Sequence, residues 1–345
     1  MPGKERHTED QRRFYGNVQY RCTLTQVIRH EVPIAIRALK TANIYEINNG
    51  RHILVDTGMS PGSLDFLLDR GVDFSKIELV VLTHLHVDHI GGAQAFRDKY
   101  GIPIAIGSND ALRSRKSQED RDGFGKFLSG ELAANGTPSD ILSRIVDRHS
   151  VLDNMSLYHD IDLDRELKGG EKIGSNIEII SNPGHSPGSI SIHIPDTNYL
   201  FTGDHLLPGI TPNISFYDEE SDMLGLYIES LKETLKLHAE KIFPGHRDPF
   251  TNGNSRILEI LNHHLERLNE ILSVSGGWSS AFEVASRIKW SKGRTLDSMN
   301  LMEMNFAIGE AISHLRHLYS LGMVEKKEKS GISTFKSSGQ ALKAL

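Results

Sequence analysis

Four side chains of the kinds that bind metal ions fall within six residues, directly after a short apolar run. The run is Glu78–Thr83 (ELVVLT), and the side chains are His84, His86, Asp88 and His89. An apolar run of this length predicts a strand buried on both faces. A loop that leaves the end of such a strand can wrap its side chains around metal ions, and imidazole together with carboxylate suits zinc, iron or manganese. This feature predicts an α/β-type core with a metal site at a strand end.

Three later positions repeat the same arrangement. His185 and His246 each follow a Pro-Gly turn, and Asp204 follows a glycine. Each of the three also comes directly after a run with strand character. Any one of them alone could be a turn residue. The ordered set, every member at the end of a predicted strand, indicates a single shared site.

The remaining pattern mixes strands and helices. The Asn-Gly turn at residues 48–50 predicts a hairpin over 42–55. Further strands are expected at 103–106, 177–180, 189–194, 199–202 and 241–243, and helices at 61–68, 93–100, 218–238 and 254–272. The charged segment 108–170 has helical propensity and few strand signals, so it is predicted to be a helical insertion or lid between core strands.

The C-terminal part reads as a separate module. Ser275-Gly276-Gly277 interrupts the pattern and marks a candidate boundary. Beyond it we expect a helix at 281–288, a strongly periodic helix from Leu301 to Leu318, and a hairpin at 323–335. This order resembles a winged-helix module. The predicted organisation is a loose N-terminal tail (1–17), a catalytic domain (18–272) and a winged-helix-like domain (273–345).

Composition narrows the class of protein. Of 345 residues, 38% are hydrophobic and 24% charged, the balance of a globular protein. No apolar run is long enough to span a membrane and no secretory signal is recognisable, so a cytoplasmic protein without membrane contact is expected. The single Cys22 excludes an internal disulfide and a cysteine-rich zinc site. The net charge of −6 argues against general nucleic-acid binding, although residues 273–345 carry a net +4.

The ordered ligands resemble the five motifs of the metallo-β-lactamase superfamily, from Asp56 to His246. The resemblance covers residues 41 to about 250. It implies an α+β fold, a four-layer αββα sandwich with the metals at one edge of the sheets. It also implies roles: His84, His86 and His185 would bind one metal, Asp88, His89 and His246 a second, Asp204 would bridge both, and Asp56 would orient the ligand loop through hydrogen bonds.

The resemblance also implies the chemistry. Two divalent ions would lower the pKa of a shared water from ~15.7 towards ~7. Zn²⁺ is the expected ion, with iron and manganese as alternatives. Hydroxide would then attack the substrate. Asp88, beside this water, would serve as ligand and as proton relay, and is the predicted catalytic residue.

The C-terminal half resembles the lactamase-beta-2-like group within this superfamily. Some members of that group are endoribonucleases selective for single strands, and many bacterial relatives are unassigned hydrolases. Two function classes therefore remain open. The first is a small-molecule hydrolase acting on an ester, thioester or lactone, with the 108–170 insertion as a lid. The alternative is an endoribonuclease whose basic tail holds RNA. The acidic whole chain favours the first, and a tail that pairs two copies into a homodimer is a third idea.

Pocket residues are less well defined by the sequence. His205, next to Asp204, could line the pocket or pack in the core. The loop 211–214, together with Phe216 and Tyr217, is predicted at the pocket rim. Arg113 lies in the insertion, where it could receive an anionic substrate or simply face solvent.

Overall fold

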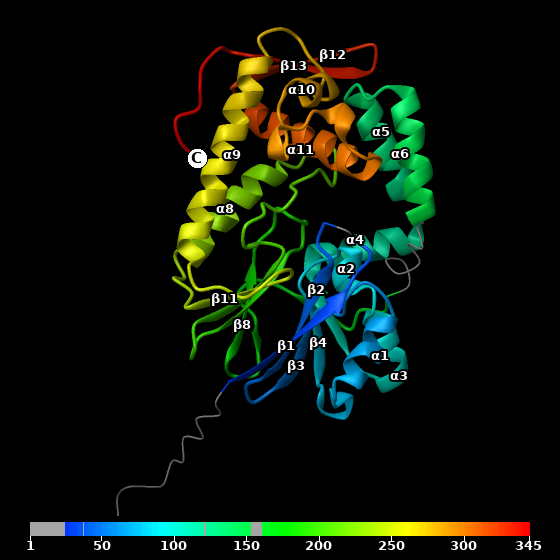
Figure 1. The fold of residues 1–345 in the computed structure, drawn as a ribbon, viewed down its shortest axis with the longest axis vertical. Helices are drawn as coiled ribbons and strands as arrows, with labels where there is room; N and C mark the ends of the chain where they lie inside the picture. The colour runs from blue at the N-terminus through cyan, green and yellow to red at the C-terminus, as the bar shows by residue number, and fades with distance from the viewer. Residues whose placement is uncertain (1–24, 37, 121, 153–160) are drawn as a thin grey trace, which may run out of the picture.

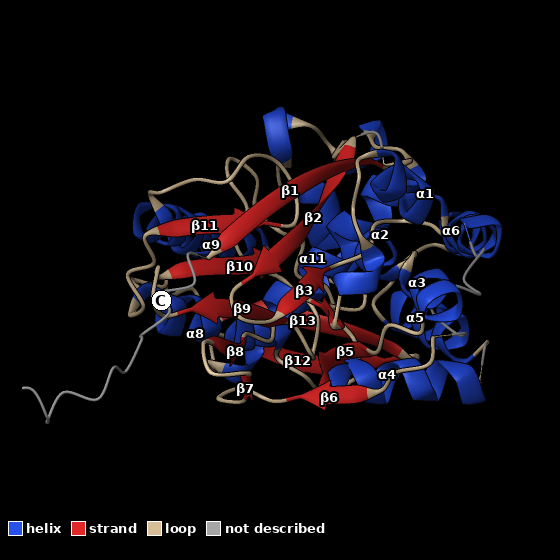
Figure 2. Cartoon of the chain, turned by 90° about the horizontal axis from the view of Figure 1, so that it is seen from below, coloured by secondary structure: helices blue, strands red, loops and turns tan. Residues whose placement is uncertain are grey.

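The computed structural model describes residues 25–36, 38–120, 122–152 and 161–345. The predicted tail at 1–17 and Cys22 lie outside these residues. Among the described helices, none combines the length and the apolar character that crossing a bilayer requires. The described chain forms two β-sheets packed face to face, with helices on their outer sides (Figures 1 and 2).

The first sheet takes its six strands in sequence order. They are β1 (Gln26–Pro33), β2 (Thr41–Asn48), β3 (His52–Val55), β4 (Leu79–Leu82), β5 (Ile104–Gly107) and β6 (Arg165–Leu167). The first three strands are antiparallel, and β3 to β6 run parallel. The predicted hairpin over 42–55 is present as β2 and β3.

The second sheet has five strands in the order β11-β10-β9-β8-β7. They are β7 (Lys172–Ile173), β8 (Ile177–Ser181), β9 (Ile190–Ile194), β10 (Tyr199–Gly203) and β11 (Lys241–Pro244). Only β10 and β11 pair in parallel; the other neighbours are antiparallel.

Alternation of side chains along each strand explains the sandwich. On β3, Ile53 and Val55 join the core between the two sheets, where they meet Ile192 and Phe201 of the second sheet. Leu54, between them, faces the other way and packs in a cluster with the helices on the outside of the first sheet. Those helices are α1 (Gly62–Asp69), α3 (Ala93–Tyr100) and α4 (Ser108–Glu119). The predicted four-layer αββα sandwich is confirmed.

The outer side of the second sheet is covered by a larger helical assembly, seen at the top of Figure 1. It contains α5 (Gly123–Ala134), α6 (Ser139–Leu152), α8 (Met223–Leu235), α9 (Gly253–Val274), α10 (Ala281–Arg287), α11 (Leu301–Ser320) and the hairpin β12 (Val324–Lys329) and β13 (Ile332–Ser337). One apolar cluster includes Leu132 of α5, Leu231 of α8, Leu268 of α9 and Leu315 of α11. The core therefore continues across the predicted boundary at residues 272 and 273.

Two elements differ from the sequence expectation. The helix predicted from Asp218 begins at Met223, because Asp222 caps it by accepting the Gly225 N–H, while Asp218 closes a turn by accepting the Ser221 N–H. The segment 108–170 is helical as expected but also supplies β6, whose three residues complete the first sheet. Short turns complete the fold: α2 (Val87–Ile90) and the 3₁₀ turns Phe74–Lys76, Ser291–Gly293 and Leu296–Ser298.

Candidate metal centre

The predicted metal ligands all follow strand ends at one edge of the sandwich. His84 comes two residues after β4, His185 four residues after β8, and Asp204 directly after β10. His246 comes two residues after β11. The sheet topology thus gathers side chains separated by up to 162 positions, and all seven predicted ligands meet in three overlapping groups.

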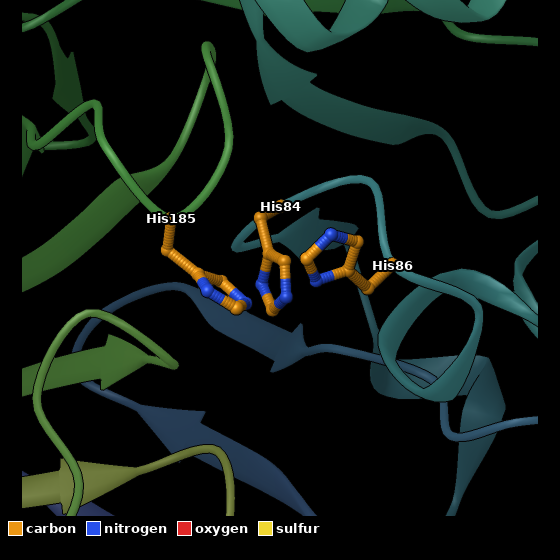
Figure 3. A group of neighbouring side chains, drawn as sticks. All are labelled: His84, His86 and His185. Atoms are coloured by element: carbon orange, nitrogen blue, oxygen red, sulfur yellow. The ribbon is translucent and has the colours of Figure 1, made fainter. Parts of the chain in front are cut away.

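The first group is formed by His84, His86 and His185. Its rings lie close, with centroids 4.7 Å apart for His84 and His86 and 4.5 Å for His86 and His185. Figure 3 shows the three imidazoles turned toward one another. One nitrogen from each lies within 4.8 Å of the others, so the three rings can share one ion.

The second group is formed by Asp88, His89 and His246. Asp88 Oδ2 lies 3.2 Å from His246 Nε2 and 3.9 Å from His89 Nε2. Two ligands of a tetrahedral zinc ion, each about 2 Å from the metal, stand about 3.3 Å apart. The observed separations fit ligands around a cation better than a hydrogen-bonded cluster. His246 Nε2 lies 3.2 Å from Asp88 Oδ2, yet it has no hydrogen-bond partner among the described residues.

Asp204 lies between the two groups. Its Oδ1 is 3.4 Å from His89 Nε2, and its Oδ2 is 3.5 Å from His246 Nε2 and 3.7 Å from His185 Nε2. The carboxylate therefore faces ligands of both groups, as a bridging residue would.

Buried atoms without partners support a cation site. Five ligand atoms buried in the described part of the chain have no hydrogen-bond partner there: His84 Nε2, His89 Nε2, His185 Nε2, His246 Nε2 and Asp204 Oδ1. Leaving such atoms unsatisfied costs about 1–3 kcal/mol each, and metal ions bound in these groups would satisfy all of them. At Gly245, a Cβ would come within 2.5 Å of Asp204 Oδ1 and 2.6 Å of His89 Cε1, so only glycine leaves this space open.

The opposite ring nitrogens are held by the protein. The Nδ1–H of His185 donates to the Asn213 carbonyl at 2.9 Å, that of His246 to the Thr41 carbonyl at 2.7 Å, and that of His89 to Asp56 Oδ2 at 2.7 Å. Because these acceptors carry no proton, each Nδ1 must be the protonated nitrogen. Each Nε2 then keeps a lone pair for the ion.

Asp56 is hydrogen-bonded to the loop that carries the first four candidate ligands. Besides His89, it accepts the Thr83 N–H at 2.7 Å and the Thr83 hydroxyl at 2.9 Å. The Thr83 Oγ1 in turn lies 3.0 Å from His84 Nδ1. One buried carboxylate thus orients ligands of both groups.

Tyr217 contacts the metal-ligand histidines directly. Its hydroxyl donates to the His185 carbonyl at 2.8 Å and lies 2.6 Å from His86 Nε2. Since the hydroxyl proton is used on His185, His86 Nε2 donates to it, and His86 Nδ1 is left to face the ion. The residue predicted at the pocket rim therefore also fixes the ring of a ligand.

Electrostatics keep the carboxylates charged. Burial raises the pKa of Asp204, but the neighbouring His246 and His89 outweigh it and hold the pKa well below its usual range. Burial lowers the pKa of His246, whereas the Asp204 charge raises it to about 10. His84 and His86 lie farther from the carboxylates, and burial lowers the pKa of both, that of His86 to about 3. A divalent cation bound beside Asp204 would take the place of the second His246 proton, because neutral imidazoles and ionised carboxylates are the forms that bind metal ions.

A buried aspartate that the sequence did not single out ties two ligand loops together. Asp110, in the first turn of α4, accepts the Leu85 N–H at 3.0 Å and the Ser186 hydroxyl at 2.6 Å through Oδ2. Its Oδ1 accepts the Gly188 N–H at 2.7 Å. Leu85 separates His84 and His86, and Ser186 follows His185. No local pattern marks this residue, because aspartate is common in the first turn of any helix.

The predicted pocket residues have different surroundings. His205 is buried, with Nε2 3.0 Å from Thr234 Oγ1 and its ring edge-on to Tyr227, so it packs between β10 and α8 rather than at a pocket rim. Phe216 is also largely buried and packs against Phe127 of α5.

Arg113 of the insertion reaches the same region. Its guanidinium donates to the Tyr217 carbonyl at 2.7 Å and lies over the rings of Tyr217 and Phe124, 4.8 and 5.1 Å from their centroids. Arg113 is therefore packed against aromatic side chains, one of which, Tyr217, hydrogen-bonds His86.

Comparisons with known proteins bear on the fold and the family of this chain. A protein from Caenorhabditis elegans named beta-lactamase-like protein 2 homolog is 26% identical over 68% of this chain and 66% of its own length. An atrochrysone carboxyl ACP thioesterase from Emericella nidulans is 25% identical over 70% of this chain and 64% of its own length. The crystal structure of a metallo-beta-lactamase family protein from Thermus thermophilus superposes with a TM-score of 0.74 at 23% identity, covering 90% of this chain and 98% of that one.

The family of this chain is shown by its match to a family model. The model of the metallo-beta-lactamase superfamily matches residues 39–246, which contain every ligand described above. The resemblance to the lactamase-beta-2-like group is confirmed by the relatives that carry that name. The chain belongs to the metallo-beta-lactamase superfamily, a family of metal-dependent hydrolases.

Proposed function

We propose that this protein hydrolyses an ester, thioester or lactone bond of a small molecule, using water at a pair of divalent metal ions. The observation that carries the proposal is the overlap of three ligand groups, in which Asp204 faces histidines of both outer groups. Zinc is the metal we propose, because tetrahedral sites of imidazole and carboxylate are its commonest environment; iron and manganese are alternatives.

The residues have separate tasks. His84, His86 and His185 would hold one ion, and Asp88, His89 and His246 the other, with Asp204 between them. Bound metals would supply Lewis acidity and lower the pKa of water at the site. Asp88, which is 6% exposed, would accept the proton of that water and pass it to the leaving group. Asp56 and Tyr217 would keep the ligand rings in position.

The surroundings favour a small organic substrate. Arg113 lies over both Phe124 of α5 and Tyr217, and Tyr217 stacks beside His86, so aromatic side chains connect the inserted helices to the first ligand group. Such a wall suits the acyl part of a thioester or ester. The relative named as an acyl-carrier-protein thioesterase supports the same substrate class.

The endoribonuclease alternative meets an obstacle in α11. In a winged-helix module the helix before the hairpin is the one that enters a nucleic-acid groove. Here that helix is α11, and ten of its residues are buried against neighbouring helices and loops. An RNA substrate would have to rely on the exposed lysines of β12 instead.

A metal assay joined to a substrate panel tests the proposal. The panel contains acyl-CoA thioesters, aryl esters, lactones, phosphodiesters and single-stranded RNA. We expect about two equivalents of divalent metal and turnover of a thioester or ester. Asp88→Asn should lose most of this activity, whereas His193→Gln, which removes a histidine bonded to Asn198 outside the cluster, should keep it.

Two results would contradict the proposal. One is full activity of the Asp88→Asn enzyme. The other is cleavage of RNA alone, with binding that weakens steeply as salt rises, which would establish the nuclease reading.

A further inference from the structure

One loop connects the first ligand group to the C-terminal helices. The carbonyl of Asn213 accepts the Nδ1–H of His185 at 2.9 Å, while His185 Nε2 faces Asp204 Oδ2 at 3.7 Å. The position of this carbonyl therefore sets the rotation of the His185 ring and the direction of its lone pair.

The Asn213 side chain is fastened to α11. Its Nδ2 donates to the Phe306 carbonyl at 3.2 Å, and its amide hydrogen-bonds the Glu310 carboxylate one turn further along the helix. Glu310 Oε1 lies 3.8 Å from Arg267 Nε of α9, whose guanidinium also covers the Trp290 ring. The loop is thus fastened to α11, and Arg267 of α9 contacts α11 at the same place.

The contact continues along the helix. The backbone of α11 approaches the loop so closely at Gly309 that a Cβ would lie 2.4 Å from Ser215 Oγ. Further on, Arg316 donates to the Asp218 carbonyl at 2.6 Å, and His317 Nδ1 lies 2.8 Å from Asp222 Oδ2. The segment 213–222 is therefore attached to α11 at both ends and in the middle.

This segment reaches two of the three histidines in the first group. Asn213 contacts His185, and Tyr217 contacts both His86 and His185. Groups that orient metal-bound histidines change metal affinity by about 10–100-fold when they are removed.

We infer that Asn213 and Glu310 are positioning residues of the metal centre, through which α11 sets the geometry of the ion bound by His84, His86 and His185. The inference rests on the proposed metal site. It gives the C-terminal helices a role in metal binding, separate from nucleic-acid binding or dimerisation.

Metal affinity of the full-length protein tests the inference. Zn²⁺ and Co²⁺ affinity would be measured by competition with a chelator, and the ligand geometry by the visible absorption of bound Co²⁺. We expect Asn213→Ala to bind the first ion on the order of tenfold or more weakly, with a changed Co²⁺ spectrum. The matched control is Asn269→Ala, since Asn269 bridges α9 to Leu342 by similar bonds that lead to no ligand. It should match wild type in affinity and spectrum.

A second pair of variants separates positioning from folding. Glu310→Ala removes the acceptor for the Asn213 amide and should weaken metal binding as Asn213→Ala does. Glu310→Gln keeps a carbonyl oxygen at that place and should restore most of the affinity. Wild-type affinity and spectrum in both Asn213→Ala and Glu310→Ala would overturn the inference. Absence of metal binding in the wild-type protein would instead overturn the proposed function, and the inference with it.

Discussion

At the scale of single residues, Asp110 has the most demanding environment outside the ligands. Two N–H groups and one hydroxyl donate to its two carboxylate oxygens. In Asp110→Asn an NH₂ group must face at least one of these donors, leaving it unsatisfied. We expect stability to fall by about 1–3 kcal/mol and metal affinity by about 10–100-fold.

Urea unfolding and chelator competition would measure both effects. The control is Asp98→Asn, an exposed aspartate whose Oδ1 accepts only the Gln94 amide. Equal metal affinity in Asp110→Asn and wild type would show that Leu85 and Ser186 hold their loops without the carboxylate.

Glu310 predicts a pH-dependent stability. Burial raises the pKa of its carboxyl to about 6 from 4.5, against the Arg267 charge and the Asn213 hydrogen bond, which lower it. The folded state therefore binds more protons than the unfolded state between these two values. Stability from this group falls as pH rises through 4.5 to 6, by about 2 kcal/mol, and stays lower above.

Glu310→Gln should lack this slope. The free energy of unfolding of both proteins would be measured from pH 4.5 to 7.5, and the difference between the curves isolates Glu310 from the other titrating groups. Two parallel curves would contradict the prediction.

The sequence singled out the candidate metal ligands because each follows a strand end and carries a side chain of a kind that binds metals. It could not predict the residues that hold them. Asp110 acts on partners 25, 76 and 78 positions away, and Asn213 on a helix 93 positions away. Such pairs depend on tertiary packing, and an aspartate or asparagine is ordinary in its own local pattern. His205, for which pocket and core were both open, shows the converse: it follows Asp204 in the sequence, yet its ring is buried against Thr234.

At the scale of elements, Gly309 indicates how closely α11 approaches the ligand loop. Glycine inside a helix costs about 1 kcal/mol relative to alanine, so its presence needs a packing reason. In Gly309→Ala the new methyl would meet Ser215 Oγ at 2.4 Å and Ser215 Cβ at 3.4 Å. We expect a loss of about 1–3 kcal/mol from this overlap, in spite of the better helix propensity.

The double variant Gly309→Ala with Ser215→Ala should regain most of this loss, because the oxygen that clashes is gone. Thermal unfolding of the two variants and of Ser215→Ala alone would decide. A Gly309→Ala protein as stable as wild type would mean that the Ser215 hydroxyl simply rotates away.

Periodicity predicted most elements but not their limits. The long helix α11 and the buried strand β4 carry strong patterns, and both were found. Helix α8 starts later than predicted because a capping aspartate, not apolar spacing, sets its first turn. Strands β6 and β7 have three and two residues, too few for any period to show, and they form only because a neighbouring strand pairs with them.

At the scale of the whole molecule, the sequence predicted a separate module from residue 273 onward. It could not predict which other elements that module packs against. An amphipathic helix shows which of its faces is buried but not which partner covers that face. In the structure, α5, α8, α9, α10 and α11 share one apolar cluster that also contains Leu200 of β10. Arg316 adds a contact to Glu131 of α5, from the inserted segment.

This shared core predicts that the protein unfolds as one cooperative unit. Both tryptophans, Trp278 and Trp290, lie in the C-terminal part, so their fluorescence reports on that part alone. The visible absorption of bound Co²⁺ reports on the metal centre. If α11 holds the ligand loop through Asn213 and Glu310, the centre cannot outlast the helices, and the two signals should change at the same temperature and denaturant concentration. Loss of the tryptophan signal well before loss of the Co²⁺ absorption would show an independent C-terminal domain, with a metal centre that the sandwich maintains unaided.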